Sequence, residues 1–319
     1  MFSWLPAAKS CSGLVPAPPP PPPEQPPPGQ RLRRLEVVAT RMVQEVFAGQ
    51  YESLFKGQGV EFSEIREYLP GDDVRSLDWN VTARLGRPFV KRNDEERELS
   101  MVVVIDSSAS MDFSSQGRSK RDVAAELAAM LAFSALQNGD KVGMVRFCKD
   151  VEHVLPPRKG RRHLMRILGE VLAAPAQPDD SRLDRVLDGL NQMFKRRALV
   201  FVMSDLMCPD FSKALARAQK RHDLSLFRIV DPWEKSLPDL GRLRVRDLET
   251  GETARIDTSR ADFRQAFVER QQQNWLKTKA ELDAKQVDWA EFSTHEPVEK
   301  PLARFFQQKK RRRLKRGRS

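Results

Sequence analysis

The chain has 319 residues, of which 31% are charged and 40% hydrophobic, a balance typical of a folded globular protein. No stretch approaches 18 consecutive apolar residues, so the sequence predicts no membrane-spanning helix. The three cysteines form no CxxC pair. This excludes a disulfide framework and a cysteine zinc site, and it favours the reducing cytoplasm. The net charge of +11 falls to +3 when the eight Lys and Arg residues of the last eleven positions are set aside, so the basicity gathers in a tail.

Composition divides the chain into a folded part between two biased ends. Residues 1–30 hold eleven of the 22 prolines and are expected to be a disordered, proline-rich tail. Residues 31–98 are expected to form a helix and a polar, hairpin-rich segment that packs on the main domain. That domain covers 99–308 and includes elaborations at its C-terminal end. Residues 309–319 are expected to be a disordered basic tail, with nucleic-acid or acidic-membrane contact as the alternative.

The predicted elements, taken in chain order, alternate between helices and strands. An amphipathic helix comes first, because Leu32, Leu35 and Val38 recur at helical spacing. Continuous apolar runs such as 99–105 predict strands buried on both faces. The predicted strands cover 88–93, 99–105, 141–147, 198–203, 224–230 and 287–292, with a hairpin at 243–247 and 254–256. The predicted helices cover 31–50, 120–137, 160–172, 183–194, 211–221 and 260–282. This alternation predicts an α/β fold, a doubly wound, mostly parallel sheet with helices on both faces.

Two of the predicted strands end in carboxylates. Asp106, Ser108 and Ser110 follow the first with a D-x-S-x-S spacing, and Asp205 follows the strand at 198–203. Alternate residues of an extended segment point the same way, and ligands of doubly wound sheets bind beyond the carboxyl ends of the strands. These hard oxygens suit Mg²⁺ or Mn²⁺, with Ser181 as a candidate fifth ligand. Helix capping by Ser110 and Asp205 is the alternative, and the two roles are compatible.

With these residues the chain resembles the metal-ion-dependent adhesion site of von Willebrand factor A domains. It is most similar to one branch, the bacterial domain-of-unknown-function family fifty-eight, over roughly residues 31–308. The segments that carry this similarity are 59–62, 66–75, 78–80, 84–98, 138–143 and 204–205. The resemblance implies a von Willebrand A-like fold and a MoxR-type AAA+ ATPase as partner, in protein maturation or assembly. Ser181 stands where adhesion sites usually place Thr, and Leu206 stands where they usually place Gly.

The polar segment 61–98 alternates acids and arginines around a few aromatic residues. One interpretation is an internal lattice of ion pairs. The other is a docking face for the ATPase, because Arg and aromatic residues are enriched at interfaces. The candidate partner-binding residues are Arg66, Asp72, Asp73, Arg75, Asp78, Trp79 and Arg84.

The sequence contains no phosphate-binding P-loop, no HExxH motif and no nucleophile elbow, so we expect no enzymatic activity. We expect a cytoplasmic adaptor that holds an acidic group of a partner protein through a divalent cation. One alternative is a metal-dependent hydrolase that uses the same carboxylates to activate water. Nucleic-acid binding through the basic tail ranks last, because that tail has no aromatic residue on which bases could stack.

Overall fold

The computed structural model describes residues 27–43, 64–70, 72–74, 77–92, 99–173, 179–248 and 251–316. Its centre is a six-stranded sheet in the order β10-β7-β6-β3-β4-β5. Neighbouring strands are parallel except for β4 and β5, which are antiparallel. The strands are β3 (Ser100–Asp106), β4 (Lys141–Phe147), β5 (Val151–Arg158), β6 (Leu199–Ser204), β7 (Asp223–Val230) and β10 (Asp288–Ser293). The predicted doubly wound, mostly parallel sheet is confirmed.

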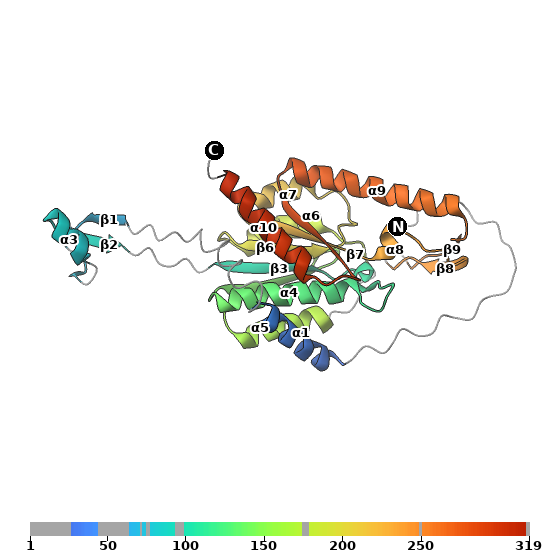
Figure 1. The fold of residues 1–319 in the computed structure, drawn as a ribbon, viewed down its shortest axis with the longest axis horizontal. Coiled ribbons are helices and arrows are strands. Elements are labelled where there is room, and N and C mark those ends of the chain that lie inside the picture. The colour runs from blue at the N-terminus through green and yellow to red at the C-terminus, as the bar shows by residue number, and fades with distance from the viewer. Residues whose placement is uncertain are drawn as a thin grey trace.

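Helices cover both faces of this sheet, as Figure 1 shows. The centre of β3 is apolar toward both sides. Met101 and Val103 join one core together with α1, α4, α5 and α10, whereas Val102 and Val104 join the other with α6, α7 and α9. The helices are α1 (Pro28–Met42), α4 (Lys120–Gln137), α5 (Arg161–Ala173), α6 (Leu183–Met193), α7 (Ser212–Gln219), α9 (Ala261–Ala284) and α10 (Glu299–Arg316).

The strand order places a topological switch point beside β3. From β3 the chain continues to β4 on one side, and it later returns to β6 on the other side of β3. The connections therefore leave the sheet in opposite directions beyond the carboxyl ends of these strands, which is where doubly wound sheets bind their ligands. Asp106 ends β3, and Asp205 follows β6. The sheet thus brings the two predicted carboxylates to this switch point.

Strand β5 is an addition to the predicted elements. Pro156 and Pro157 argue against a strand in the sequence, because proline cannot donate a hydrogen bond to a neighbouring strand. The strand is nevertheless tolerated, since it lies at the edge of the sheet and its pairing with β4 is irregular between Val142 and Met144. The small hairpin is present as predicted, formed by β8 (Arg242–Arg246) and β9 (Thr253–Asp257).

The polar N-terminal segment contains a second small hairpin. Strands β1 (Glu64–Glu67) and β2 (Phe89–Arg92) pair antiparallel, and the short helix α3 (Trp79–Leu85) lies between them in the sequence. Residues 44–63 and 93–98, which connect this hairpin to the rest of the chain, lie outside the described residues. Its packing on the main domain therefore stays a prediction. The proline-rich residues 1–26 also lie outside the described part.

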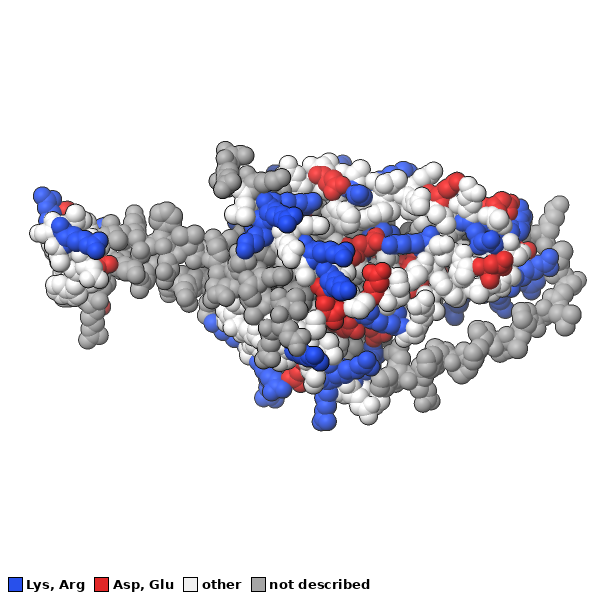
Figure 2. Space-filling model, viewed as in Figure 1, with Lys and Arg blue, Asp and Glu red and all other residues white. Residues whose placement is uncertain are grey.

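Helix α10 corrects the prediction of a disordered basic tail from residue 309. Phe305 and Phe306 are buried in the core, and Lys309 lies one turn later on the same face with 1% of its side chain exposed. Its ammonium donates to Asp223 Oδ1 at 2.8 Å and to Ser225 Oγ at 2.7 Å. Figure 2 shows basic side chains gathered over α10 with acidic ones beside them. The basic residues from Lys309 onward belong to the same helix as the buried Phe305 and Phe306. The packing of that apolar face on the core keeps the helix intact through Arg316.

Replacing Lys309 by Met should destabilise the fold, because it removes the buried cation that pairs with Asp223 and Asp288. Removing one partner of a buried ion pair costs about 3 kcal/mol. We expect a loss of this size in the free energy of unfolding measured by urea denaturation. The matched control is Lys310→Met, which changes an exposed neighbour and should stay within about 0.5 kcal/mol of wild type. Equal effects of the two substitutions would contradict the assignment of Lys309 to the core.

The same ion pair predicts an acid-sensitive part of the stability. Burial acts to raise the pKa of Asp223, but Lys309 and Arg313 lower it below the usual 3.8. A lowered folded-state pKa means that Asp223 stabilises the fold fully above pH 3.8, and that this contribution is lost as the pH falls through the folded-state value. The difference between wild type and Lys309→Met in urea unfolding should therefore shrink below pH 3.8. A difference that is independent of pH would disprove the coupling.

Candidate functional site

Asp106, at the end of β3, is the centre of a buried hydrogen-bond cluster. The backbone N–H of Ser108 donates to its Oδ1 at 2.9 Å. The hydroxyls of Ser181 and Ser204 donate to its Oδ2 at 2.9 and 2.7 Å. Asp106 and Ser204 are fully buried, and Ser181 is 4% exposed. Three donors from three parts of the chain thus hold one buried carboxylate in place.

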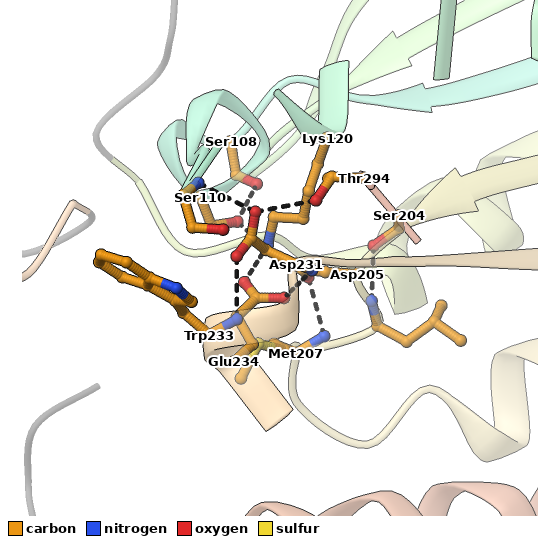
Figure 3. Close-up of polar contacts among 12 residues, drawn as sticks. Ser108, Ser110, Lys120, Ser204, Asp205, Met207, Asp231, Trp233, Glu234 and Thr294 are labelled. Atoms are coloured by element: carbon orange, nitrogen blue, oxygen red, sulfur yellow. Dashed lines mark hydrogen bonds and ion pairs between the residues drawn. The ribbon is translucent and has the colours of Figure 1, made fainter. Parts of the chain in front are cut away.

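Asp205 joins this cluster from the end of β6. The Ser110 hydroxyl donates to Asp205 Oδ2 at 2.8 Å, and the hydroxyls of Ser108 and Ser110 lie 3.0 Å apart. The backbone N–H of Met207 donates to Asp205 Oδ1 at 3.0 Å. The structure therefore brings all five predicted ligands into one connected cluster, part of which Figure 3 shows in close-up.

The alternative that Ser110 and Asp205 cap the following helices is wrong. Ser119 caps α4 instead, through a reciprocal pair of hydrogen bonds with Asp122. The residue before α7 is Phe211, which provides no side-chain cap. Ser110 and Asp205 instead turn their side chains toward each other and toward the cluster.

Lys120 adds a cation to the cluster that the sequence did not predict. The Ser119 cap makes it the first residue of α4, and its side chain is completely buried. Its ammonium donates to Asp205 Oδ2 at 2.7 Å and also to Glu234 Oε1. A positive charge is unfavourable at a helix N-terminus. The two carboxylates therefore account for its position.

Glu234 belongs to the short helix α8 (Pro232–Lys235), which begins directly after β7. Asp231 caps this helix at the Trp233 N–H, and Glu234 accepts from the backbone N–H of Asp231 in return. Asp231 also accepts from the hydroxyl of Thr294, just beyond β10, at 2.9 Å. The network of Figure 3 therefore joins the start of α4 to the ends of β6, β7 and β10.

Burial and charge shift the pKa values of these groups in different directions. Burial and then the charge of Asp205 raise the pKa of Asp106. Burial acts to raise the pKa of Asp205 too, but the Lys120 ammonium outweighs it and lowers that pKa. Burial acts to lower the pKa of Lys120, yet the attraction of Asp205 and Glu234 raises it above its usual value. The Lys120–Asp205 pair is therefore held in its ionised form.

Leu206 adopts the left-handed backbone conformation, with φ of 57°. This conformation is uncommon for residues with a Cβ, and it explains why glycine suits the position after such an aspartate. Leu206 keeps it because its side chain is buried in the core and its N–H donates to Ser204 Oγ at 3.0 Å. The turn that aims Asp205 at the cluster is thus fixed by apolar packing.

The donor set fits a small divalent cation. Among the residues that the structure describes, no group of three or more His, Cys, Asp or Glu side chains is placed to hold a metal ion. A cation here would depend on serine hydroxyls together with the two aspartates. The oxygen pairs Ser108–Ser110 and Ser110–Asp205 are 3.0 and 2.8 Å apart. Adjacent ligands of an octahedral Mg²⁺ with bonds of about 2.1 Å are separated by about 3.0 Å, so these oxygens have the spacing of neighbouring ligands.

The candidate partner-binding residues divide between local structure and surface. Arg66 pairs with Asp72, and Asp78 caps α3. These contacts agree with the internal ion-pair interpretation. Trp79 is 69% exposed, and Arg84 and Asp73 are also exposed. Arg75 lies outside the described residues. Trp79 projects a large apolar side chain into solvent, which is compatible with a docking role for this hairpin. That role stays a prediction.

Sequence reasoning missed Lys120, Asp231 and Glu234. Asp231 had a usable signal, because it follows an apolar strand just as Asp205 does. Glu234 stands three residues after Asp231 in the spacing of a capping box. Lys120 gave no signal, since a lysine at the start of a helix normally lies in solvent.

Comparison with known proteins places the chain in one family. The model of the family described as "Protein of unknown function DUF58" matches residues 64–276, about two thirds of the chain. The uncharacterized protein Rv1480 of Mycobacterium tuberculosis (strain ATCC 25618 / H37Rv) is 34% identical over 223 residues, which are 69% of this chain and 70% of that protein. The uncharacterized protein YeaD of Bacillus subtilis (strain 168) is 24% identical over 118 residues, 37% of this chain and 27% of YeaD.

Solved structures with a similar fold include BatB from Bacteroides thetaiotaomicron, with a TM-score of 0.42 and 15% identity over 66% of this chain and 98% of BatB. Another is the SpRpn10 VWA domain, with a TM-score of 0.36 and 13% identity over 66% of this chain and 95% of that domain. Likeness at this level carries no information about function. No helix in the described part of the chain is long and apolar enough to span a membrane.

Replacing Ser204 by Ala should weaken the cluster without altering its surface. The substitution removes a buried hydroxyl that donates to Asp106 and accepts from Leu206. An unsatisfied buried polar group costs about 1–3 kcal/mol, so we expect a loss of this size in the free energy of unfolding by urea. Ser236→Ala, at an exposed position, serves as the control. A stability equal to that of the control would show that the Ser204 hydrogen bonds contribute nothing.

Proposed function

This chain belongs to the DUF58 family of proteins of unknown function, and we propose that it is a non-enzymatic, protein-binding adaptor. In this proposal a divalent cation, Mg²⁺ or Mn²⁺, is held at the ends of β3 and β6 and binds an acidic group of a partner protein. The observation that carries the proposal is the convergence of Asp106, Ser108, Ser110, Ser181 and Asp205 at the switch point of the sheet. These are hard oxygen donors of the kind that Mg²⁺ prefers.

The burial of the cluster supports a site that opens to solvent on one side. Asp106 and Ser108 are fully buried and Asp205 is 2% exposed, whereas Ser110 is partly exposed. Met207 and Trp233, which flank the cluster in Figure 3, are also partly exposed. A partner group would therefore approach on the side of Ser110 and meet the rest of the site from there.

The chain's own residues would orient the donors. Ser181 and Ser204 direct their protons at Asp106 Oδ2, so this carboxyl oxygen fixes which way both hydroxyls point. Ser108 and Ser110 are placed with their oxygens together, and the Met207 N–H holds Asp205 Oδ1. When bound, the cation would supply the positive charge that attracts the partner's carboxylate.

We propose a MoxR-type AAA+ ATPase as the partner, as the family resemblance implies, with the cytoplasm as the compartment. The exposed Trp79 makes the β1–α3–β2 hairpin a candidate second contact, since tryptophan is enriched at interfaces. The described part of the basic C-terminal run supports neither nucleic-acid binding nor a free tail, because Lys309, Arg312 and Arg313 pair with carboxylates of the sheet. No observation favours the hydrolase alternative over the adaptor.

The proposal predicts that partner binding depends on the cation and on the serine cluster. Binding of the purified chain to a purified MoxR-type ATPase from the same genome should be measured by biolayer interferometry, with Mg²⁺ and with excess chelator. We expect chelator, Asp106→Ala and Ser110→Ala each to weaken binding at least about tenfold, or about 1.4 kcal/mol.

Ser236→Ala is the matched control for Ser110→Ala, because it removes a serine hydroxyl at an exposed position. It should bind as wild type does. Affinity that is unchanged by chelator would overturn the cation mechanism. Affinity lost only in Trp79→Ala would place the interface on the hairpin instead.

A further inference from the structure

The cluster already contains one cation of its own. The ammonium of Lys120 is completely buried and cannot reach a partner protein, so its contacts are those within the fold. It lies 2.7 Å from Asp205 Oδ2, the same oxygen that accepts from the Ser110 hydroxyl at 2.8 Å. A divalent ion that drew on Asp205 would therefore meet an oxygen that is already shared with a fixed positive charge.

Lys120 has a second carboxylate available. Glu234 also accepts from its ammonium, and Glu234 is itself held by the backbone N–H of Asp231 at 3.0 Å. The Lys120 ammonium thus lies between Asp205, a predicted metal ligand, and Glu234 of α8, as Figure 3 shows. A stronger ion pair between Lys120 and Glu234 means a weaker ion pair between Lys120 and Asp205.

We propose that Lys120 is a built-in counter-ion that competes with the divalent cation for Asp205, and that Glu234 sets the strength of this competition by drawing the ammonium away. This inference rests on the proposed function, because it assumes that the cluster receives a cation. Lys120 lowers the cation affinity of the empty cluster, so the acidic group of the partner must help to hold the ion. Cation and partner then bind together more tightly than either binds alone.

The proposal predicts effects of opposite sign for two substitutions, measured as Mn²⁺ affinity by isothermal titration calorimetry and by electron paramagnetic resonance of free Mn²⁺. Lys120→Met removes the competitor and should tighten Mn²⁺ binding at least about tenfold. Glu234→Gln leaves the lysine wholly on Asp205 and should weaken Mn²⁺ binding. In the double variant the effect of Glu234→Gln should largely disappear, because Glu234 acts through Lys120.

Lys309→Met is the matched control. It removes another buried lysine that pairs with Asp223 and Asp288, at the opposite ends of the strands from the cluster. It should lower stability and leave Mn²⁺ affinity unchanged. If Lys120→Met fails to fold, Glu234→Gln still tests the proposal, since it keeps the lysine and predicts weaker binding.

The outcomes separate this inference from the proposed function. If wild type and Lys120→Met bind Mn²⁺ equally well, the inference is overturned and the cation mechanism stands. If only Lys120→Met binds Mn²⁺ in the absence of the partner, the competition is supported, and the proposed function fails only if chelator also leaves partner binding unchanged. If neither protein binds Mn²⁺, both fail. An affinity of Glu234→Gln equal to or higher than that of wild type would also overturn the inference.

Discussion

The structure at the carboxyl ends of β3 and β6 depends on two buried carboxylates, Asp106 and Asp205. An isolated buried carboxylate is too costly to keep ionised, so each must be met by donors or by a positive charge. Asp106 is met by two hydroxyls and a backbone N–H, and Asp205 by a hydroxyl, a backbone N–H and the Lys120 ammonium. The loops beyond β3 and β6, the start of α4 and the placement of α8 all follow from supplying those partners.

The sheet was largely predictable because its strands carry their own signal. Residues such as Val102, Val103 and Val104 are apolar without alternation, which only a strand covered on both faces satisfies, and the ends of α4 agree with the predicted ones. The edge strand β5 was not predictable in this way, since Pro156 and Pro157 are permitted only by its place at the margin of the sheet. That place is a property of the tertiary structure.

The site was predictable only in part, for a related reason. The D-x-S-x-S spacing identifies Asp106, Ser108 and Ser110 as candidate ligands, and its place after an apolar strand identifies Asp205. Lys120 does not, because what distinguishes it is the pair of acids that approach from β6 and α8. The Lys309 position was misjudged for a different reason. The high density of positive charge after residue 308 predicted a disordered tail, although the four-residue spacing from Phe305 places Lys309 on the buried face of a helix.

Because of the ion pairs of α10, the number of basic residues in this helix overstates the positive charge that it presents to another molecule. Lys309, Arg312 and Arg313 each bind a carboxylate of β7 or β10, while Lys310 and Arg311 are exposed. Much of the positive field of this run is therefore cancelled at short range before it reaches solvent. Retention on a cation-exchange resin should accordingly report a more modest basic patch than eight Lys and Arg residues in the last eleven positions suggest.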